Sequence, residues 1–155
     1  MTEFRGTPRA PATRRVALVV SRYHELITTK LLDGARACCK EHGVKDDRVD
    51  VLWTPGAFEL AVVAERAASS GKYAAIVALG CVIRGETPHF DYVAGEAARG
   101  LGNVAFAHQV PVGFGVLTVE NEEQAVARSG GALGNKGFEA AEAALATADL
   151  LTQLP

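Results

Sequence analysis

A histidine follows a glycine-bounded stretch in the segment from Gly80 to Tyr92, where the chain leaves an apolar run and enters a helical pattern. A histidine side chain can exchange protons near neutral pH. The residues before it, Thr87 and Pro88, suit a helix start, because threonine can cap a helix and proline is tolerated at its first position. Free amides at such a start bind anions. The segment suits a site that holds an anion and moves a proton through His89, although an ordinary strand-to-helix turn with a solvated histidine remains the simpler alternative.

Two neighbours of His89 limit this hypothesis. Cys81 lies in the same segment and has to be considered as a nucleophile, but a thiol that directly follows a core strand more often serves packing. The carboxylate of Glu86 would repel a bound phosphate unless it turned away. We therefore expect the backbone amides of Glu86 and Thr87, rather than the Glu86 side chain, to face an anion.

The elements that must position this segment follow from the apolar periodicity. Uninterrupted apolar runs predict buried strands, and apolar spacings of three and four residues predict helices. The expected strands are 16–20, 49–53, 74–79 and 112–119, and the expected helices are 27–38, 57–70, 90–104, 122–128 and about 137–151. This order, βαβαβαβαα, predicts a flavodoxin-like α/β fold: a three-layer α/β/α sandwich around a four-stranded parallel sheet.

Residues with useful chemistry gather where the predicted strands end. Ligands of open parallel sheets bind beyond the carboxyl ends of the strands, and those ends carry Tyr23, Phe58 with Glu59, and the segment that leads to His89. Tyr23 could stack on a flat ring or close the core, and the sequence alone favours the core. The other histidines, His24, His42 and His108, are expected at the surface, and no spacing among the four indicates a metal site.

The overall composition narrows the class of protein. The chain has 155 residues and a formal net charge of −2, which fits a single domain from residue 15 to 155 and argues against a nucleic-acid partner. Residues 1–14 are rich in arginine and proline and are expected to form a flexible arm. No apolar run is long enough for a secretory signal or a membrane span. Three cysteines cannot all pair, which favours the reducing cytoplasm.

Several short motifs, each weak alone, occur in a specific order along the chain. They are Ser21-Arg22-Tyr23, Pro55-Gly56-Ala57-Phe58-Glu59, Gly80-Cys81-Val82-Ile83-Arg84-Gly85, His89-Phe90-Asp91-Tyr92-Val93, Gly113-Phe114-Gly115-Val116-Leu117-Thr118, Glu122-Glu123-Gln124-Ala125 with Arg128, and Gly134-Asn135-Lys136-Gly137. With this order and spacing the chain, from about residue 15 to 152, resembles the 6,7-dimethyl-8-ribityllumazine synthase family. The resemblance implies a cofactor-independent transferase that condenses 5-amino-6-(D-ribitylamino)uracil with 3,4-dihydroxy-2-butanone 4-phosphate and releases phosphate and water, the penultimate step of riboflavin biosynthesis.

The resemblance also implies roles for individual residues. Tyr23 would stack on the uracil ring, His89 would be the proton donor, and Arg128 would pair with the phosphate. Lys136 would be a supporting cation, and Phe114 and Arg128 would reach the site from a neighbouring subunit. The ribitylamino substrate would contact Ala57, Phe58, Glu59, Cys81, Val82 and Ile83, and the phosphate would bind to the loop at Glu86 and Thr87.

The same resemblance implies a homo-oligomer, at least a pentamer. The short segment from Arg128 to Lys136 is compatible with a sixty-subunit shell, whereas the prolines of the N-terminal arm could oppose one. Two related functions remain open: a paralogous riboflavin synthase that uses the lumazine itself, and a non-catalytic shell that stores flavin or lumazine. A signalling receiver domain is disfavoured, because Ser21 and Arg22 stand where it needs an acidic residue.

Overall fold

A parallel sheet of four strands forms the centre of the protein, whose 155 residues are all described by the computed structural model. The strand order is β2-β1-β3-β4. The strands are β1 (Arg15–Ser21), β2 (Val49–Thr54), β3 (Tyr73–Ile83) and β4 (Val112–Val119). All three pairings are parallel, as the sequence predicts.

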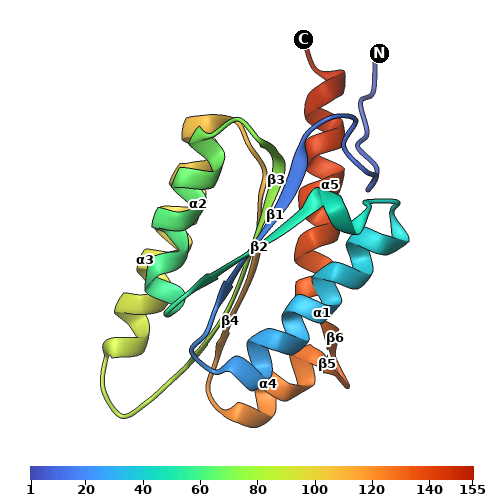
Figure 1. Cartoon of the computed structure of the whole chain (residues 1–155). Helices are drawn as coiled ribbons and strands as arrows, with labels where there is room; N and C mark the ends of the chain where they lie inside the picture. Colours follow the sequence, from blue (N-terminus) through green and yellow to red (C-terminus); the bar gives the residue numbers. More distant parts are fainter.

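Helices cover both faces of this sheet (Figure 1). On one face lie α1 (Glu25–Glu41), the short α4 (Glu122–Arg128) and α5 (Lys136–Gln153), and on the other lie α2 (Leu60–Ser69) and α3 (His89–His108). Two single 3₁₀ turns, η1 (Asp46–Arg48) and η2 (Ala57–Glu59), precede β2 and α2. The predicted three-layer α/β architecture is therefore confirmed.

The two faces of the central strands explain their uninterrupted apolar sequences. Along β1, Val16, Leu18 and Val20 pack against α1 and α5, while Ala17 and Val19 pack against α2 and α3. All five are fully buried. Because both faces of β1 are covered, no polar residue alternates with the apolar ones.

The longest strand differs most from its prediction. The sequence predicts a strand over 74–79 followed by a loop at Gly80, but β3 continues to Ile83. Its last three residues pair with β4 in the register Cys81↔Leu117, Val82↔Thr118 and Ile83↔Val119. Hydrogen bonds to a strand about 35 residues away hold this segment extended, so only residues 84–88 form the connection to α3.

Two smaller features were also missed. The sequence analysis does not predict the hairpin formed by β5 (Ser129–Gly131) and β6 (Gly134–Asn135). Gly130 and Gly134 have positive φ angles of 105° and 80°, a backbone conformation that favours glycine. The expectation that Thr87 caps α3 is wrong, because Pro88 occupies the N-cap position and no side chain caps this helix.

The N-terminal segment 1–14 contains no helix or strand and follows α5, close to the C-terminus (Figure 1). The Thr7 amide donates a hydrogen bond of 2.9 Å to Asp149, and the Arg9 guanidinium lies 3.0 Å from the same carboxylate. The Ala10 amide donates to the His42 carbonyl. These contacts give the segment a defined path beside α5, and its flexibility remains a prediction. No helix of the protein is long and apolar enough to cross a membrane.

A hydrogen-bonded group ties the amino ends of the three strands β1, β2 and β3 together. Arg15 donates from Nε and Nη2 to the carboxylate of Asp50, at 2.8 and 2.6 Å, and the Tyr73 hydroxyl donates to the same carboxylate at 2.8 Å. The hydrogen bond from Arg15, followed by that from Tyr73, lowers the pKa of Asp50. Asp50 is therefore charged at neutral pH and bridges neighbouring strands.

The substitution Asp50→Asn tests this bridge. A carboxylate whose folded-state pKa is lowered stabilises the fold above its unfolded value of 3.8, and this contribution is lost as the pH falls through the folded-state pKa. Because Asp50 is partly exposed, we expect the melting temperature at pH 7 to fall by only about 2–4 °C. The difference in melting temperature between the variant and the wild type should become smaller below about pH 4. Asp33→Asn, at an exposed position on α1, is the control. An equal fall in melting temperature in both variants, at pH 7 and below pH 4 alike, would show that Asp50 does not stabilise the fold in this way.

Candidate active site

The sheet topology opens one edge of the molecule between two helices. In the strand order β2-β1-β3-β4, the chain leaves β1 toward β2 and leaves β3 toward β4, in opposite directions across the sheet. The connection after β1 therefore runs over one face of the sheet, and the connection after β3 runs over the other. Ligands of doubly wound folds bind at such a switch point, beyond the carboxyl ends of the strands.

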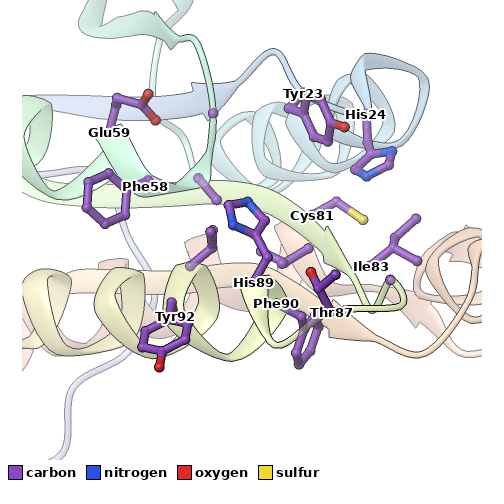
Figure 2. Close-up of a pocket in the computed structure, with 15 residues that line it drawn as sticks. Tyr23, His24, Phe58, Glu59, Cys81, Ile83, Thr87, His89, Phe90 and Tyr92 are labelled. Atoms are coloured by element: carbon purple, nitrogen blue, oxygen red, sulfur yellow. The ribbon is translucent and has the colours of Figure 1, made fainter.

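A cavity of about 750 Å³ lies at this position (Figure 2). Its walls come from the ends of β1, β2 and β3 and from the first turn of α3. The lining residues are Tyr23, His24, Gly56, Ala57, Phe58, Glu59, Cys81, Val82, Ile83, Gly85, Thr87, His89, Phe90, Tyr92 and Val93. The volume is typical of small-molecule sites, and most of its lining is apolar with a few polar groups.

Most of the residues expected from the sequence to bind substrate line this cavity. Nine of them do so: Tyr23, Ala57, Phe58, Glu59, Cys81, Val82, Ile83, Thr87 and His89. They come from segments up to about 65 residues apart in the sequence, and the sheet edge brings them together. Glu86, Phe114, Arg128 and Lys136 do not line it.

His89 is the first residue of α3, and its ring stands at the centre of the cavity in Figure 2. The side chain is exposed to the cavity, so it can give a proton to a bound molecule or take one from it. No side chain caps the start of α3; the Asp91 amide donates to the Pro88 carbonyl at 3.0 Å, and the amides of the first two helical residues are left free, beside the loop residues Gly85 and Thr87. Amides at a helix start favour negative charge. The cavity thus holds an imidazole that could move a proton and backbone amides that could bind an anion.

The aromatic wall after β1 is formed by Tyr23 and His24. Tyr23 is 67% exposed, so the interpretation that it closes the core is wrong. The two rings meet edge to face, with centroids 4.7 Å apart. His24 has a left-handed backbone, with φ 59° and ψ 50°. Its carbonyl accepts hydrogen bonds from the amides of Ile27 and Thr28 at the start of α1. This turn directs both rings toward the cavity, where Tyr23 presents a stacking surface.

The fixed charges of the cavity do not by themselves suit a phosphate. Its only carboxylate is that of Glu59, its imidazoles are those of His24 and His89, and no lysine or arginine lines it. For a bound dianion, this chain therefore offers backbone amides and histidine side chains as hydrogen-bond donors, but no permanently charged lysine or arginine. No group of three or more His, Cys, Asp or Glu side chains in the structure could hold a metal ion.

Three of the residues assigned by resemblance lie elsewhere on the chain. Phe114 is in the edge strand β4 and is 48% exposed. Arg128 ends α4, where its guanidinium donates to the Gln124 carbonyl at 3.0 Å. Lys136 begins α5 and pairs with Glu139 at 3.2 Å. Within one chain, these side chains are separate from the cavity.

Six of the lining residues were assigned no role from the sequence, although three of them lie in the segment from Gly80 to Tyr92 that it singles out. Phe90, Tyr92 and Val93 belong to the first turn of α3 and could have been found from the helical spacing that follows His89. His24 was expected at the surface and is half-buried. Its left-handed backbone turns it inward, and no sequence signal marks that turn. Gly56 and Gly85 carry no side chain that would identify them.

Cys81 lies in the cavity wall with an almost fully buried side chain. Burial, with a smaller effect from Glu122, raises the pKa of its thiol to about 11. At neutral pH the sulfur is protonated, and a protonated thiol is a poor nucleophile. The structure therefore favours a contact role for Cys81 over covalent chemistry.

Alkylation with iodoacetamide at pH 8 tests this conclusion. The raised thiol pKa predicts that Cys81 reacts about a hundredfold more slowly in the native protein than in the unfolded protein. Mass spectrometry of tryptic peptides separates Cys81 from Cys38 and Cys39, whose pKa values burial raises to about 12 and 11 and which serve as internal controls. Labelling of native Cys81 at the rate of an unfolded thiol would restore it as a candidate nucleophile.

Comparison with known protein families identifies a match over most of the chain. The family profile described as 6,7-dimethyl-8-ribityllumazine synthase matches residues 13–152. The match spans all four strands of the sheet and every residue that lines the cavity.

Proposed function

Because the chain belongs to the 6,7-dimethyl-8-ribityllumazine synthase family and acts in riboflavin biosynthesis, we propose that the cavity beside α3 is one half of its active site, completed by a second copy of the chain. One observation carries the proposal. Nine expected substrate residues line a single cavity, whereas the expected phosphate-binding cation, Arg128, lies outside it. A neighbouring copy would supply the positive charge that the cavity lacks.

The cavity has surfaces that suit both substrates. Tyr23 offers an exposed ring for stacking on the uracil of 5-amino-6-(D-ribitylamino)uracil. Ala57, Phe58 and Glu59 would contact the ribitylamino group from the η2 turn, where the Glu59 carboxylate can accept hydrogen bonds from hydroxyls. The amides of Glu86 and Thr87 and the start of α3 would hold the phosphate of 3,4-dihydroxy-2-butanone 4-phosphate.

His89 would then move the protons that the condensation requires. The amine of one substrate attacks the ketone of the other and forms a Schiff base with loss of water. Phosphate then leaves by elimination, and the ribitylamino nitrogen attacks the remaining carbonyl; loss of a second water closes the ring and completes the lumazine. Each of these steps needs a proton given or taken near the phosphate end of the cavity, where His89 stands. Proton transfer of this kind contributes about 10²–10⁴-fold, and the remaining acceleration would come from holding two substrates together.

Arg128 of a second copy would bind the phosphate through its guanidinium, and Phe114 of that copy would close the apolar wall. Lys136 would add a more distant positive charge. The chain also exposes large apolar side chains that a partner would cover, including Phe106 on α3 and Phe114 on β4. We propose a homopentamer or a shell built from pentamers, located in the cytoplasm, where three free buried thiols would remain reduced.

Incubation of the purified protein with both substrates separates the synthase from its two alternatives. A synthase forms the lumazine, which is followed by its absorbance and fluorescence. A riboflavin synthase consumes added lumazine, and a storage shell binds lumazine without turnover. Formation of lumazine only at the uncatalysed rate would contradict the proposal, and sedimentation of the same sample measures the assembly.

The variant His89→Ala tests the assigned proton carrier. We expect kcat to fall by about 10²-fold or more, because no other imidazole at the start of α3 lines the cavity. The sedimentation coefficient should be unchanged. His108→Ala, at the opposite end of the same helix and 2.7 Å from Glu65, is the matched control and should keep the wild-type rate. Equal rates for His89→Ala and the wild type would remove His89 from the mechanism.

A further inference from the structure

The connection between β3 and α3 has few contacts of its own. Residues 84–88 are all exposed, and no side chain caps the helix that follows. Gly85, Glu86 and Thr87 make no hydrogen bond to the rest of the protein. Yet Gly85 and Thr87 line the cavity, and the amides of this connection are proposed to hold the phosphate.

Arg84 supplies the contacts that the rest of this connection lacks. Its amide donates to the Val119 carbonyl at 2.9 Å, which extends the β3–β4 ladder by one residue. Its Nε donates to a Glu120 carboxylate oxygen at 2.9 Å, and Nη1 lies 3.5 Å from a carboxylate oxygen of Asp91. The guanidinium also lies over the Phe90 ring, 4.3 Å from its centroid. One side chain therefore joins the end of β4 to the first turn of α3.

We propose that Arg84 is a positioning residue for the phosphate-bearing substrate. Arg84 does not line the cavity, so it acts through Gly85, Thr87 and the start of α3. By fixing α3 against the end of β4, the guanidinium sets where the amides of this connection and of the start of α3 point. This inference rests on the proposed function, because it assigns the anion site of that function to the connection that Arg84 holds.

The geometry requires an arginine rather than any cation. Nε and Nη1 lie on one planar group and reach two carboxylates on different elements, while the face of the same group covers Phe90. A lysine ammonium is a point charge and cannot span these three partners. The charge also matters, because the carboxylates of Asp91 and Glu120 would otherwise stand unneutralised close to the start of α3, where phosphate is proposed to bind.

Arg84 and the two carboxylates that it contacts are solvent-exposed, with side-chain exposures of 40% for Arg84, 61% for Asp91 and 60% for Glu120. Exposed ion pairs contribute little to global stability. The buried residues of β3 and β4 hold the sheet together without them. Loss of Arg84 is therefore expected to disturb the anion site while the protein remains folded and assembled.

Steady-state kinetics of Arg84→Ala, Arg84→Lys and Glu120→Gln test the inference. For Arg84→Ala we expect kcat/KM for the phosphate substrate to fall about ten- to a hundredfold, with a higher KM and weaker competitive inhibition by inorganic phosphate. The KM for the ribitylaminouracil should stay within about threefold, because its contacts come from other elements. Arg84→Lys should recover only a small part of the loss, and Glu120→Gln should show a smaller defect of the same kind. Arg99→Ala, which breaks an exposed pair with Glu96 further along α3, is the control.

Each alternative outcome has a defined meaning. If kcat falls with no change in the KM for the phosphate substrate, Arg84 is merely structural and the inference is wrong. If Arg84→Lys matches the wild type, charge alone suffices and the positioning role is wrong. If Arg84→Ala fails to fold, two milder variants decide between the same outcomes. Arg84→Lys keeps an aliphatic side chain and a positive charge at this position, and Glu120→Gln keeps the arginine itself. Absence of lumazine formation by the wild type would instead contradict the proposed function.

Discussion

The pairing of β1 with β3 is the constraint on which the rest of the structure depends. These two strands are buried on both faces, and their parallel hydrogen bonds run from Arg15↔Tyr73 to Val20↔Leu79. Because β2 lies beyond β1 and β4 lies beyond β3, the two following connections must leave over opposite faces of the sheet. The carboxyl edge between them cannot be covered by either connection, and the cavity occupies that opening. The same pairing places Tyr23 and His89 on facing walls.

Stability and chemistry are divided between different parts of this framework. The apolar residues of β1 and β3, together with α1 and α5, form the larger buried cluster and contribute most to folding. Most of the residues proposed to act on substrate lie outside it, in the turn after β1, in η2 and at the start of α3, whereas Cys81 belongs both to this cluster and to the cavity wall. The connection 84–88 is exposed and held through one arginine, so the proposed anion site lies on a segment with few contacts to the rest of the protein.

The sequence predicts the fold well because the buried strands are uninterrupted apolar runs bounded by glycine, proline or polar residues. It fails for the last part of β3, since Gly80 and Cys81 resemble the start of a loop and only the distant strand β4 keeps them extended. The strand ends were sufficient to find both facing walls of the cavity, that of Tyr23 and that of His89. His24 was missed because a left-handed backbone turns it inward. The role proposed for Arg128 could not be predicted from periodicity, because a contact between two copies of a chain would leave no signal in the pattern of one chain.

The most direct test of a site shared between two copies is complementation between inactive subunits. His89→Ala removes the proton carrier from one wall, and Arg128→Ala removes the cation from the other. Each variant alone should assemble but remain close to inactive. If each site takes His89 from one copy and Arg128 from its neighbour, co-expression in equal amounts restores about a quarter of the wild-type sites in mixed oligomers. The account is contradicted if the mixed oligomers are no more active than the average of the two variants. Such a result would mean that His89 and Arg128 act within the same chain, or that Arg128 has no part in the site.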